Sequence, residues 1–238
     1  MSNNYFRFKQ FIVYQERSAF NVGTDGVLLG AYAYISGSAR ILEIGTGTGL
    51  IALMLAQRSE TEIVAIEPEV NSYAEACHNT GLSKWKDRIR VINCTLQDYL
   101  PVDTLFDLIV ANPPYFIDSL KNPDPHKSMA RHNTMLSHAD ILVAATRLLR
   151  EDGKLQIILP YAEGNIFIAD AHEYGFYCND ILKIKPLPSG AIRRMILCFS
   201  RQRTIVTEKF LTIEKGKRHE FTDDYIKLTG DFYLNFFH

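Results

Sequence analysis

Asn112, Pro113, Pro114 and Tyr115 form the segment of this chain best suited to chemistry on a substrate. The segment ends an apolar run typical of a buried strand, and open α/β sheets bind ligands at the carboxyl ends of their strands. The prolines lack a backbone N–H, which leaves carbonyls to accept hydrogen bonds from a ligand. Asn112 adds a side-chain carbonyl, and Tyr115 adds a flat ring for stacking. This set fits a planar amine and indicates methylation of its nitrogen, whereas the alternative is a Pro-Pro turn that only closes the strand.

A glycine cluster, Gly45, Gly47 and Gly49, ends an earlier strand-like run and precedes a helical pattern. Glycines let the backbone pass close to a ligand and present N–H groups near a helix N-terminus. The spacing differs from a dinucleotide fingerprint, because Leu50 stands where its third glycine would be. Glu43, just upstream, would repel a pyrophosphate but suits a ligand with an ammonium group and a sulfonium centre. S-adenosylmethionine has both groups.

Two further acids follow later strand-like runs. Glu67 closes the next run, where a carboxylate can accept hydrogen bonds from both ribose hydroxyls. Asp98 follows the third run, where it can accept a hydrogen bond from the adenine amino group of the cofactor. Because these elements come in order at the carboxyl ends of successive strands, together they predict a site for S-adenosylmethionine beside Asn112.

Strand-like runs alternate with helical patterns along the chain. The strand-like runs are 40–45, 62–67, 89–94, 106–112, 154–160, 177–184 and 195–201, and the helical patterns are 50–58, 69–79, 137–150 and 164–174. This alternation predicts βαβ units and a parallel sheet with helices on both faces. Only a short loop with two prolines joins the last two strands, so they are expected to pair antiparallel. The predicted fold is α/β and Rossmann-like, a mostly parallel seven-stranded sheet with an antiparallel C-terminal hairpin.

Length and composition are those of an ordinary globular chain. It has 238 residues, of which 47% are hydrophobic and 22% charged, and a net charge of −1, so a nucleic acid would have to bind a local basic patch. No apolar run is long enough for a membrane span and no signal pattern is present, so a cytoplasmic protein without membrane association is expected. The cysteines are widely separated and include no Cys-x-x-Cys pair, so neither a zinc site nor a disulfide is expected. His126 and His132 lie on a loop without fixed geometry, so no metal is expected there either.

A single domain is expected over residues 1–238, with an N-terminal arm at 1–38, a cofactor-binding and catalytic core at 39–160, and a C-terminal part with a basic patch at 161–238. The polar loop 119–132 follows the Asn-Pro-Pro-Tyr segment, and we expect it to be mobile until a substrate binds. The candidate phosphate-binding cations are Lys121, Lys127, Arg131, Arg193, Arg194, Arg201 and Arg203. A merely solvated surface is the alternative for these cations. A monomer is expected, with the C-terminal aromatic residues packed on the domain.

The motifs of the chain resemble those of class I S-adenosylmethionine-dependent methyltransferases that act on amino nitrogens. Within that class the chain is most similar, over nearly its whole length, to bacterial tRNA adenine-N6 methyltransferases that modify the adenosine 3′ of the anticodon in a valine tRNA. The segments that support this resemblance are 8–11, 22–31, 221–225 and 231–234, beside 43–49, Glu67, Asp98 and 112–115.

The resemblance implies a class I methyltransferase fold, S-adenosylmethionine as cofactor and tRNA as partner. It implies cofactor contacts at Thr24, Asp25, Glu43, Gly45, Gly47, Gly49, Glu67, Asp98 and Asn112, and catalytic or target-base contacts at Asn112, Pro113, Pro114 and Tyr115. One departure is Glu67 followed by Pro68, where many relatives have Asp and a different residue, but a longer carboxylate still reaches a ribose. The alternatives are an amino methyltransferase acting on ribosomal RNA, DNA or a protein glutamine, and a non-catalytic RNA-binding module on the same fold.

Overall fold

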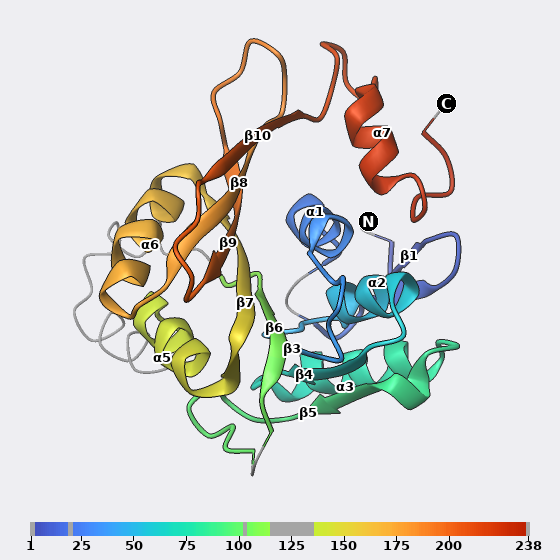
Figure 1. The fold of residues 1–238 in the computed structure, drawn as a ribbon. Coiled ribbons are helices and arrows are strands. Elements are labelled where there is room, and N and C mark those ends of the chain that lie inside the picture. The colour runs from blue at the N-terminus through green and yellow to red at the C-terminus, as the bar shows by residue number, and fades with distance from the viewer. Residues whose placement is uncertain (1–2, 19–20, 102–103, 115–135, 237–238) are drawn as a thin grey trace, which may run out of the picture.

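The computed structural model describes residues 3–18, 21–101, 104–114 and 136–236 of the chain. Within these residues, eight strands form one sheet in the order β10-β8-β9-β7-β6-β3-β4-β5 (Figure 1). The strands are β3 (Arg40–Ile44), β4 (Glu62–Ile66), β5 (Ile89–Ile92), β6 (Phe106–Ala111), β7 (Leu149–Pro160), β8 (Tyr177–Lys185), β9 (Arg194–Ser200) and β10 (Thr207–Thr212). Every predicted strand is therefore present, with its bounds shifted by a few residues at most except at the start of β7.

Strand β9 alone among these eight runs against the others. The strands β5, β4, β3, β6 and β7 pair in parallel, whereas β9 is antiparallel to both of its neighbours, β7 and β8. The predicted hairpin of β8 and β9 is thus confirmed. The predicted count of seven strands is wrong, because β10 pairs in parallel with β8 at the edge of the sheet. Its exposed Glu208 and Lys209 interrupt any apolar run that would have revealed it.

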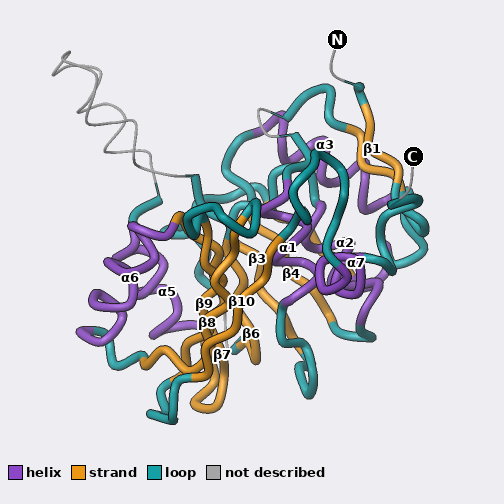
Figure 2. Tube along the Cα trace, turned by 90° about the horizontal axis from the view of Figure 1, so that it is seen from above, coloured by secondary structure: helices purple, strands orange, loops and turns teal. Residues whose placement is uncertain are grey.

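Helices cover both faces of the sheet, as the sequence predicts. The helices α1 (Thr24–Tyr32), α2 (Leu50–Arg58) and α3 (Val70–Gly81) lie on one face, and α5 (His138–Leu148) and α6 (Tyr161–Glu173) lie on the other (Figures 1 and 2). A short α7 (Asp223–Thr229) lies beside α1, and a 3₁₀ turn covers Lys86–Arg88. Two hydrophobic cores result, one on each face of the sheet.

Capping residues explain where two of these helices begin. The side chain of Glu69 accepts hydrogen bonds from the backbone N–H groups of Asn71 and Ser72 at the start of α3. Ser137 and Asp140 form a capping box at the start of α5. Helix α1 lies in the part of the chain that the sequence analysis describes as an N-terminal arm. Gly30 of α1 allows this helix to pack closely on α2, since a Cβ at Gly30 would come within 2.8 Å of the sulfur of Met54.

The two ends of the described chain lie side by side (Figures 1 and 2). The strands β1 (Tyr5–Arg7) and β2 (Ile12–Tyr14) form an antiparallel hairpin. The backbone N–H of Lys9 next to it donates to the carbonyl of Phe232 at 2.8 Å. Phe232 is 1% exposed, so its predicted packing on the domain is confirmed.

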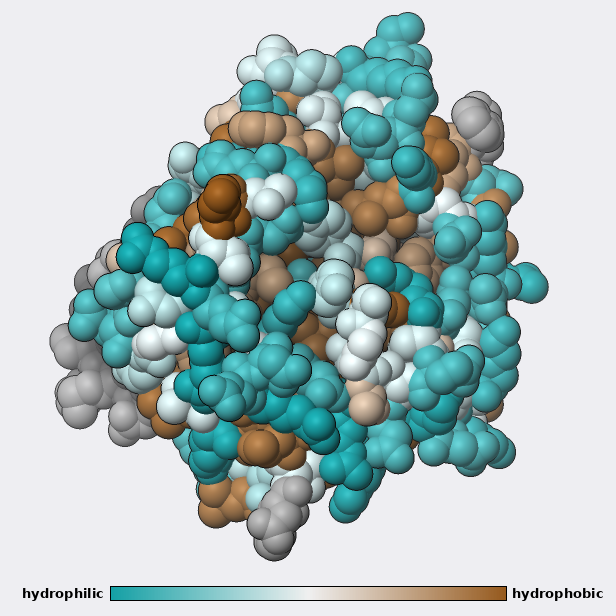
Figure 3. Space-filling model, viewed as in Figure 1, coloured by the Kyte–Doolittle hydropathy of each residue, from teal (hydrophilic) through white to brown (hydrophobic). Residues whose placement is uncertain are grey.

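The surface is mostly hydrophilic on the side seen in Figure 3, where hydrophobic residues appear in small separate groups. None of the helices in the described ranges combines the length and apolar character needed to cross a membrane. In the same ranges, no cluster of three or more His, Cys, Asp or Glu residues is arranged to hold a metal ion.

Candidate active site

The predicted motifs meet at the edge of the sheet where β3, β4 and β6 end. Ile44, the last residue of β3, pairs with Ile66 of β4 on one side and with Ala111 of β6 on the other. The glycine loop that follows Ile44 therefore lies between the segment starting at Glu67 and the segment starting at Asn112. Neighbouring strands are about 4.8 Å apart, so each of these segments begins one strand spacing from the loop.

The glycine loop presents bare backbone toward open space. Gly45, Gly47 and Gly49 have φ angles of 70°, 56° and 82°, which side chains of L-residues strongly disfavour. A Cβ added at Gly45 or Gly47 would meet no heavy atom within 4 Å. A Cβ at Gly49 would instead lie 3.3 Å from Cγ2 of Thr80 in α3. The first two glycines thus leave room for a ligand, while the third lets α2 start close against α3.

Hydrogen bonds fix the shape of this loop. The backbone N–H groups of Gly45 and Thr46 donate to the carbonyl of Ile66 at 2.9 and 3.1 Å. The N–H of Gly47 donates to Oε2 of Glu67 at 2.8 Å. Since the backbone is held from several sides, the loop is organised before any ligand binds.

Glu43 lies beneath the loop and is fully buried, with 0% exposure. Its Oε2 accepts a hydrogen bond from the hydroxyl of Thr46 at 2.8 Å, and its Oε1 is buried without a hydrogen-bond partner. Burial raises the pKa of Glu43 to about 8; the nearby Glu67 carboxylate also raises it, and the Thr46 hydroxyl opposes the change. The carboxyl group predicted to meet a cationic ligand is therefore buried beneath the loop and bonded to the Thr46 hydroxyl.

Glu67 closes the other side of the loop. Besides the bond from Gly47, its Oε1 accepts a bond from the backbone N–H of Glu69 at 3.0 Å. Burial raises the pKa of Glu67, and these two backbone donors oppose that shift. Each carboxylate oxygen has a second lone pair, so Glu67 can still accept hydrogen bonds from a ligand. Asp98 is exposed in the segment after β5, where its Oδ2 accepts from the hydroxyl of Thr95 at 2.6 Å.

The segment after β6 borders both the loop and helix α1. Asn112 is half-buried, Pro113 is buried and Pro114 is exposed. A Cβ added at Gly26 in the first turn of α1 would lie 3.1 Å from Cδ2 of Leu50 and 4.0 Å from Nδ2 of Asn112. The structure thus brings the start of α1, with Thr24 and Asp25, next to both motifs. Tyr115, the loop 119–132 and its cations Lys121, Lys127 and Arg131 lie outside the described residues.

The reversed direction of β9 brings its first residue to the same edge of the sheet. Nε of Arg194 donates to Oδ2 of Asp25 at 2.8 Å, and both side chains are partly buried. A residue predicted to contact RNA is therefore joined to one predicted to lie near the cofactor. The neighbouring Arg193 is exposed, and its carbonyl accepts a bond from the N–H of Tyr161 at 3.1 Å.

The other two predicted RNA-binding arginines lie at the opposite end of β9. Arg201 and Arg203 come after its last residue, roughly 20 Å from Arg194 at the usual rise per residue of a strand. The Arg201 guanidinium donates to the carbonyl of Thr146 at 2.7 Å and lies 5.0 Å from the centre of the Phe176 ring. The structure does not bring these two arginines together with the active-site edge.

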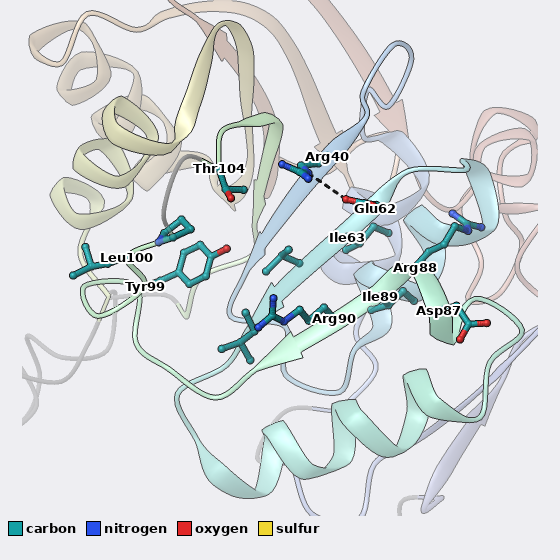
Figure 4. A pocket seen from close by; sticks show the side chains of 13 residues that line it. Arg40, Glu62, Ile63, Asp87, Arg88, Ile89, Arg90, Tyr99, Leu100 and Thr104 are labelled. Atoms are coloured by element: carbon teal, nitrogen blue, oxygen red, sulfur yellow. Dashed lines mark hydrogen bonds and ion pairs between the residues drawn. The ribbon is translucent and has the colours of Figure 1, made fainter.

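A hollow of about 580 Å³ lies at the other end of β3, β4 and β5 (Figure 4). Arg40 and Glu62 line it from the starts of their strands and form an ion pair at 3.1 Å, and Tyr99 forms part of the opposite wall. None of the residues that line this hollow is a predicted site residue. The open face of the glycine loop, and not this hollow, is the candidate site.

Sequence reasoning missed Glu75 and Asn79, two polar residues on the buried face of α3 whose side chains bond to the backbone near the glycine loop. They belong to no motif, since they bond to backbone atoms of distant segments. The only signal in the sequence is the presence of polar side chains at helical spacing among small apolar ones.

Comparison with known proteins identifies the family. The model of the methyltransferase small domain family matches residues 23–164, more than half of the chain. The tRNA1(Val) (adenine(37)-N6)-methyltransferase of Trichodesmium erythraeum is 43% identical, with 99% of this chain and 100% of that protein covered. A protein of the same name from Bacteroides thetaiotaomicron is 42% identical, with 99% of each chain covered.

Solved structures support the fold. A predicted O-methyltransferase from Agrobacterium tumefaciens superposes with a TM-score of 0.65 at 20% identity, covering 87% of this chain and 96% of that chain. The Pyrococcus horikoshii TYW2 structure in complex with MeSAdo gives a TM-score of 0.59 at 15% identity, covering 83% of this chain and 71% of that chain. The fold predicted from the sequence is therefore confirmed, and the chain belongs to the methyltransferase small domain family and, within it, to the family of tRNA1(Val) (adenine(37)-N6)-methyltransferases.

Proposed function

We propose that this protein transfers a methyl group from S-adenosylmethionine to N6 of an adenosine in tRNA, next to the anticodon of a valine tRNA. The observation that carries the proposal is the position of the open glycine loop one strand spacing from Asn112 and Pro113. The names of the full-length relatives supply the tRNA and the position of the base.

The residues around the glycine loop fit the cofactor. The space beside Gly45 and Gly47 admits a ligand against bare backbone, as a Cβ at either position would occupy it. We assign the ribose hydroxyls to Glu67, the adenine amino group to Asp98, and the methionine end to the start of α1 with Thr24 and Asp25. The bound cofactor supplies a methyl group on positively charged sulfur, and the chain supplies its position relative to the acceptor.

Asn112 and Pro113 prepare the acceptor nitrogen. The lone pair of an adenine amino group is shared with the ring, which makes the nitrogen a poor nucleophile. The side-chain oxygen of Asn112 and the carbonyl of Pro113 accept the two amino hydrogens and draw them out of the ring plane. These hydrogen bonds strengthen as positive charge develops on nitrogen, so they stabilise the transition state more than the bound substrate. The methylated nitrogen then releases its proton to water, and no catalytic histidine is required.

Tyr115 completes the proposed site. We infer that its ring stacks on a flipped adenine, an interaction worth about 1–3 kcal/mol in comparable complexes. Tyr115→Ala should therefore raise the KM for tRNA and lower kcat, whereas Asn112→Ala should mainly lower kcat.

The RNA is proposed to approach from the side of β9 and the loop after β6. Arg193 is exposed at that edge and Arg194 is bonded to Asp25, so a phosphate bound there lies close to the cofactor end of the site. Lys121, Lys127 and Arg131 are assigned to the same RNA backbone. We propose that the protein acts in the cytoplasm as a monomer and a single domain, and a tRNA substrate supports that location.

The proposal is tested with labelled S-adenosylmethionine and total tRNA from a strain that lacks the enzyme. Label recovered as N6-methyladenosine in tRNA is the expected result, whereas label in protein or in no product contradicts the proposal. Asn112→Ala should lower kcat by about 10²–10³. Asn165→Ala, a change at an exposed asparagine of α6, is the matched control. Wild-type activity in Asn112→Ala would refute the assigned mechanism.

A further inference from the structure

Helix α3 holds two distant segments of the chain through the side chain of Asn79, which is 1% exposed. Its Nδ2 donates to the carbonyl of Thr48 in the glycine loop at 2.9 Å and to the carbonyl of Tyr14 at the end of β2 at 2.8 Å. Its Oδ1 accepts from the backbone N–H of Tyr14 at 2.9 Å. One buried amide therefore joins the N-terminal arm directly to the loop assigned to the cofactor.

Glu75, one helical turn before Asn79, binds the next residues of the arm. Its Oε1 accepts from the backbone N–H groups of Glu16 and Arg17 at 2.6 and 3.0 Å, and its Oε2 accepts from that of Ser18 at 2.8 Å. Glu75 is 3% exposed, so three backbone donors surround a buried carboxylate. Charge-assisted hydrogen bonds of this kind are about twice as strong as neutral ones.

The arm held in this way leads directly to the active-site edge. It continues to Thr24, the first residue of α1, whose first turn lies beside Leu50 and Asn112. The side chain of Gln15, the residue after Tyr14, accepts a hydrogen bond from the backbone N–H of Val22 at 2.8 Å. This bond joins the end of the hairpin to the residues just before α1. Among the described residues, 14–18 are thus bonded to the buried face of α3, and Tyr14 shares Asn79 with the glycine loop.

We propose that Asn79 and Glu75 are positioning residues that hold the N-terminal arm against the glycine loop, so that the arm forms one wall of the cofactor site. This inference rests on the proposed function, because it takes the glycine loop as the cofactor site. Asn79 fixes the backbone of the loop and the start of the arm in one geometry, and Glu75 fixes the direction of the arm toward α1. Neither side chain needs to touch the cofactor.

The test is the binding of S-adenosylhomocysteine, measured by calorimetry without any RNA. Asn79→Ala removes all three hydrogen bonds and is expected to raise the Kd about tenfold, because the loop and the arm are no longer fixed in the binding geometry. Asn71→Ala, at an exposed asparagine of the same helix, is the matched control and should leave the Kd unchanged. At saturating cofactor, Asn79→Ala should retain most of the wild-type kcat.

Hydrogen exchange of the peptide 12–18 supplies a readout that is independent of catalysis. In the wild type, S-adenosylhomocysteine should slow exchange in this peptide, and in Asn79→Ala the slowing should be lost. If Asn79→Ala does not fold, Glu75→Gln tests the same idea, because its amide replaces an accepting oxygen and releases part of the arm. A variant that lowers Tm but keeps the wild-type Kd and the wild-type protection overturns the proposal. Failure of tRNA methylation alongside intact, Asn79-dependent cofactor binding would instead overturn only the proposed substrate.

Discussion

Replacement of the buried Glu43 by glutamine should remove a large part of the pH dependence of folding. Glu43 is fully buried, and burial raises its pKa from its ordinary value of 4.5 to about 8. Below pH 4.5 both the folded and the unfolded chain hold the proton, and the contribution of Glu43 to stability is fully present. As the pH rises toward 8, only the unfolded chain releases the proton, so the folded state loses stability relative to it.

The size of the effect follows from the two pKa values. A difference of one pKa unit corresponds to about 1.4 kcal/mol, so raising the pKa from 4.5 to about 8 corresponds to roughly 5 kcal/mol across the whole range. Between pH 5 and pH 8 the free energy of unfolding of the wild type should therefore fall by about 3.5 kcal/mol more than that of Glu43→Gln. Local relaxation and water entry reduce this figure, which is an upper bound.

The assay is urea denaturation of both proteins at several pH values between 5 and 8, with the stability difference plotted against pH. Glutamine keeps the shape of the side chain and removes the titrating group, so the difference isolates the Glu43 carboxyl. Glu151→Gln, at an exposed glutamate, is the matched control. A constant difference between wild type and Glu43→Gln over this range would show that the buried carboxyl does not retain its proton, and the reasoning would fail.

Two further predictions concern the ligand-binding surfaces. Gly47→Ala and Gly37→Ala should each lower the free energy of unfolding by about 1 kcal/mol, because both glycines have positive φ and open space around them. Only Gly47→Ala should also weaken the binding of S-adenosylhomocysteine, as measured by calorimetry. Arg193→Glu should weaken tRNA binding and lower the slope of log affinity against log salt by about 1 or more. Arg201→Glu, at the far end of β9, should change this slope less. Equal slopes for the two variants would contradict the proposed RNA path.

The sequence was sufficient to predict the sheet because most strands carry unbroken apolar runs. Strands with both faces covered by helices need such runs, and β3 and β6 show them clearly. The helix α1 was missed because two glycines interrupt its pattern, although Gly30 is what allows α2 to approach it. The early start of β7 was also missed, since a register shift between Phe106 and Leu108 separates its first residue from the rest of the pairing.

Candidate site residues could be predicted where ligand chemistry constrains the residue type. Contacts between distant segments of the chain itself could not be predicted in this way. The glycines and Asn112 stand out in the sequence because their residue types suit a ligand at the ends of strands, and the structure brings them to one edge of the sheet. The burial of Glu43 under the loop was not predictable, because its depth depends on how α2 begins. The same holds for the pairing of Arg194 with Asp25, which depends on the reversed direction of a distant strand.

Because β9 runs against the other strands, two separate segments of the chain meet at the active-site edge. Because β8 ends and β9 begins at the active-site edge, the connection 186–193 lies there too, although it comes after the cofactor-binding strands in the chain. An exchange of this connection between relatives would alter the surface that we propose to meet the substrate and leave the glycine loop, Glu67 and Asn112 untouched. Substrate choice can therefore evolve, or be engineered, in a segment that the methyl-donor site does not constrain.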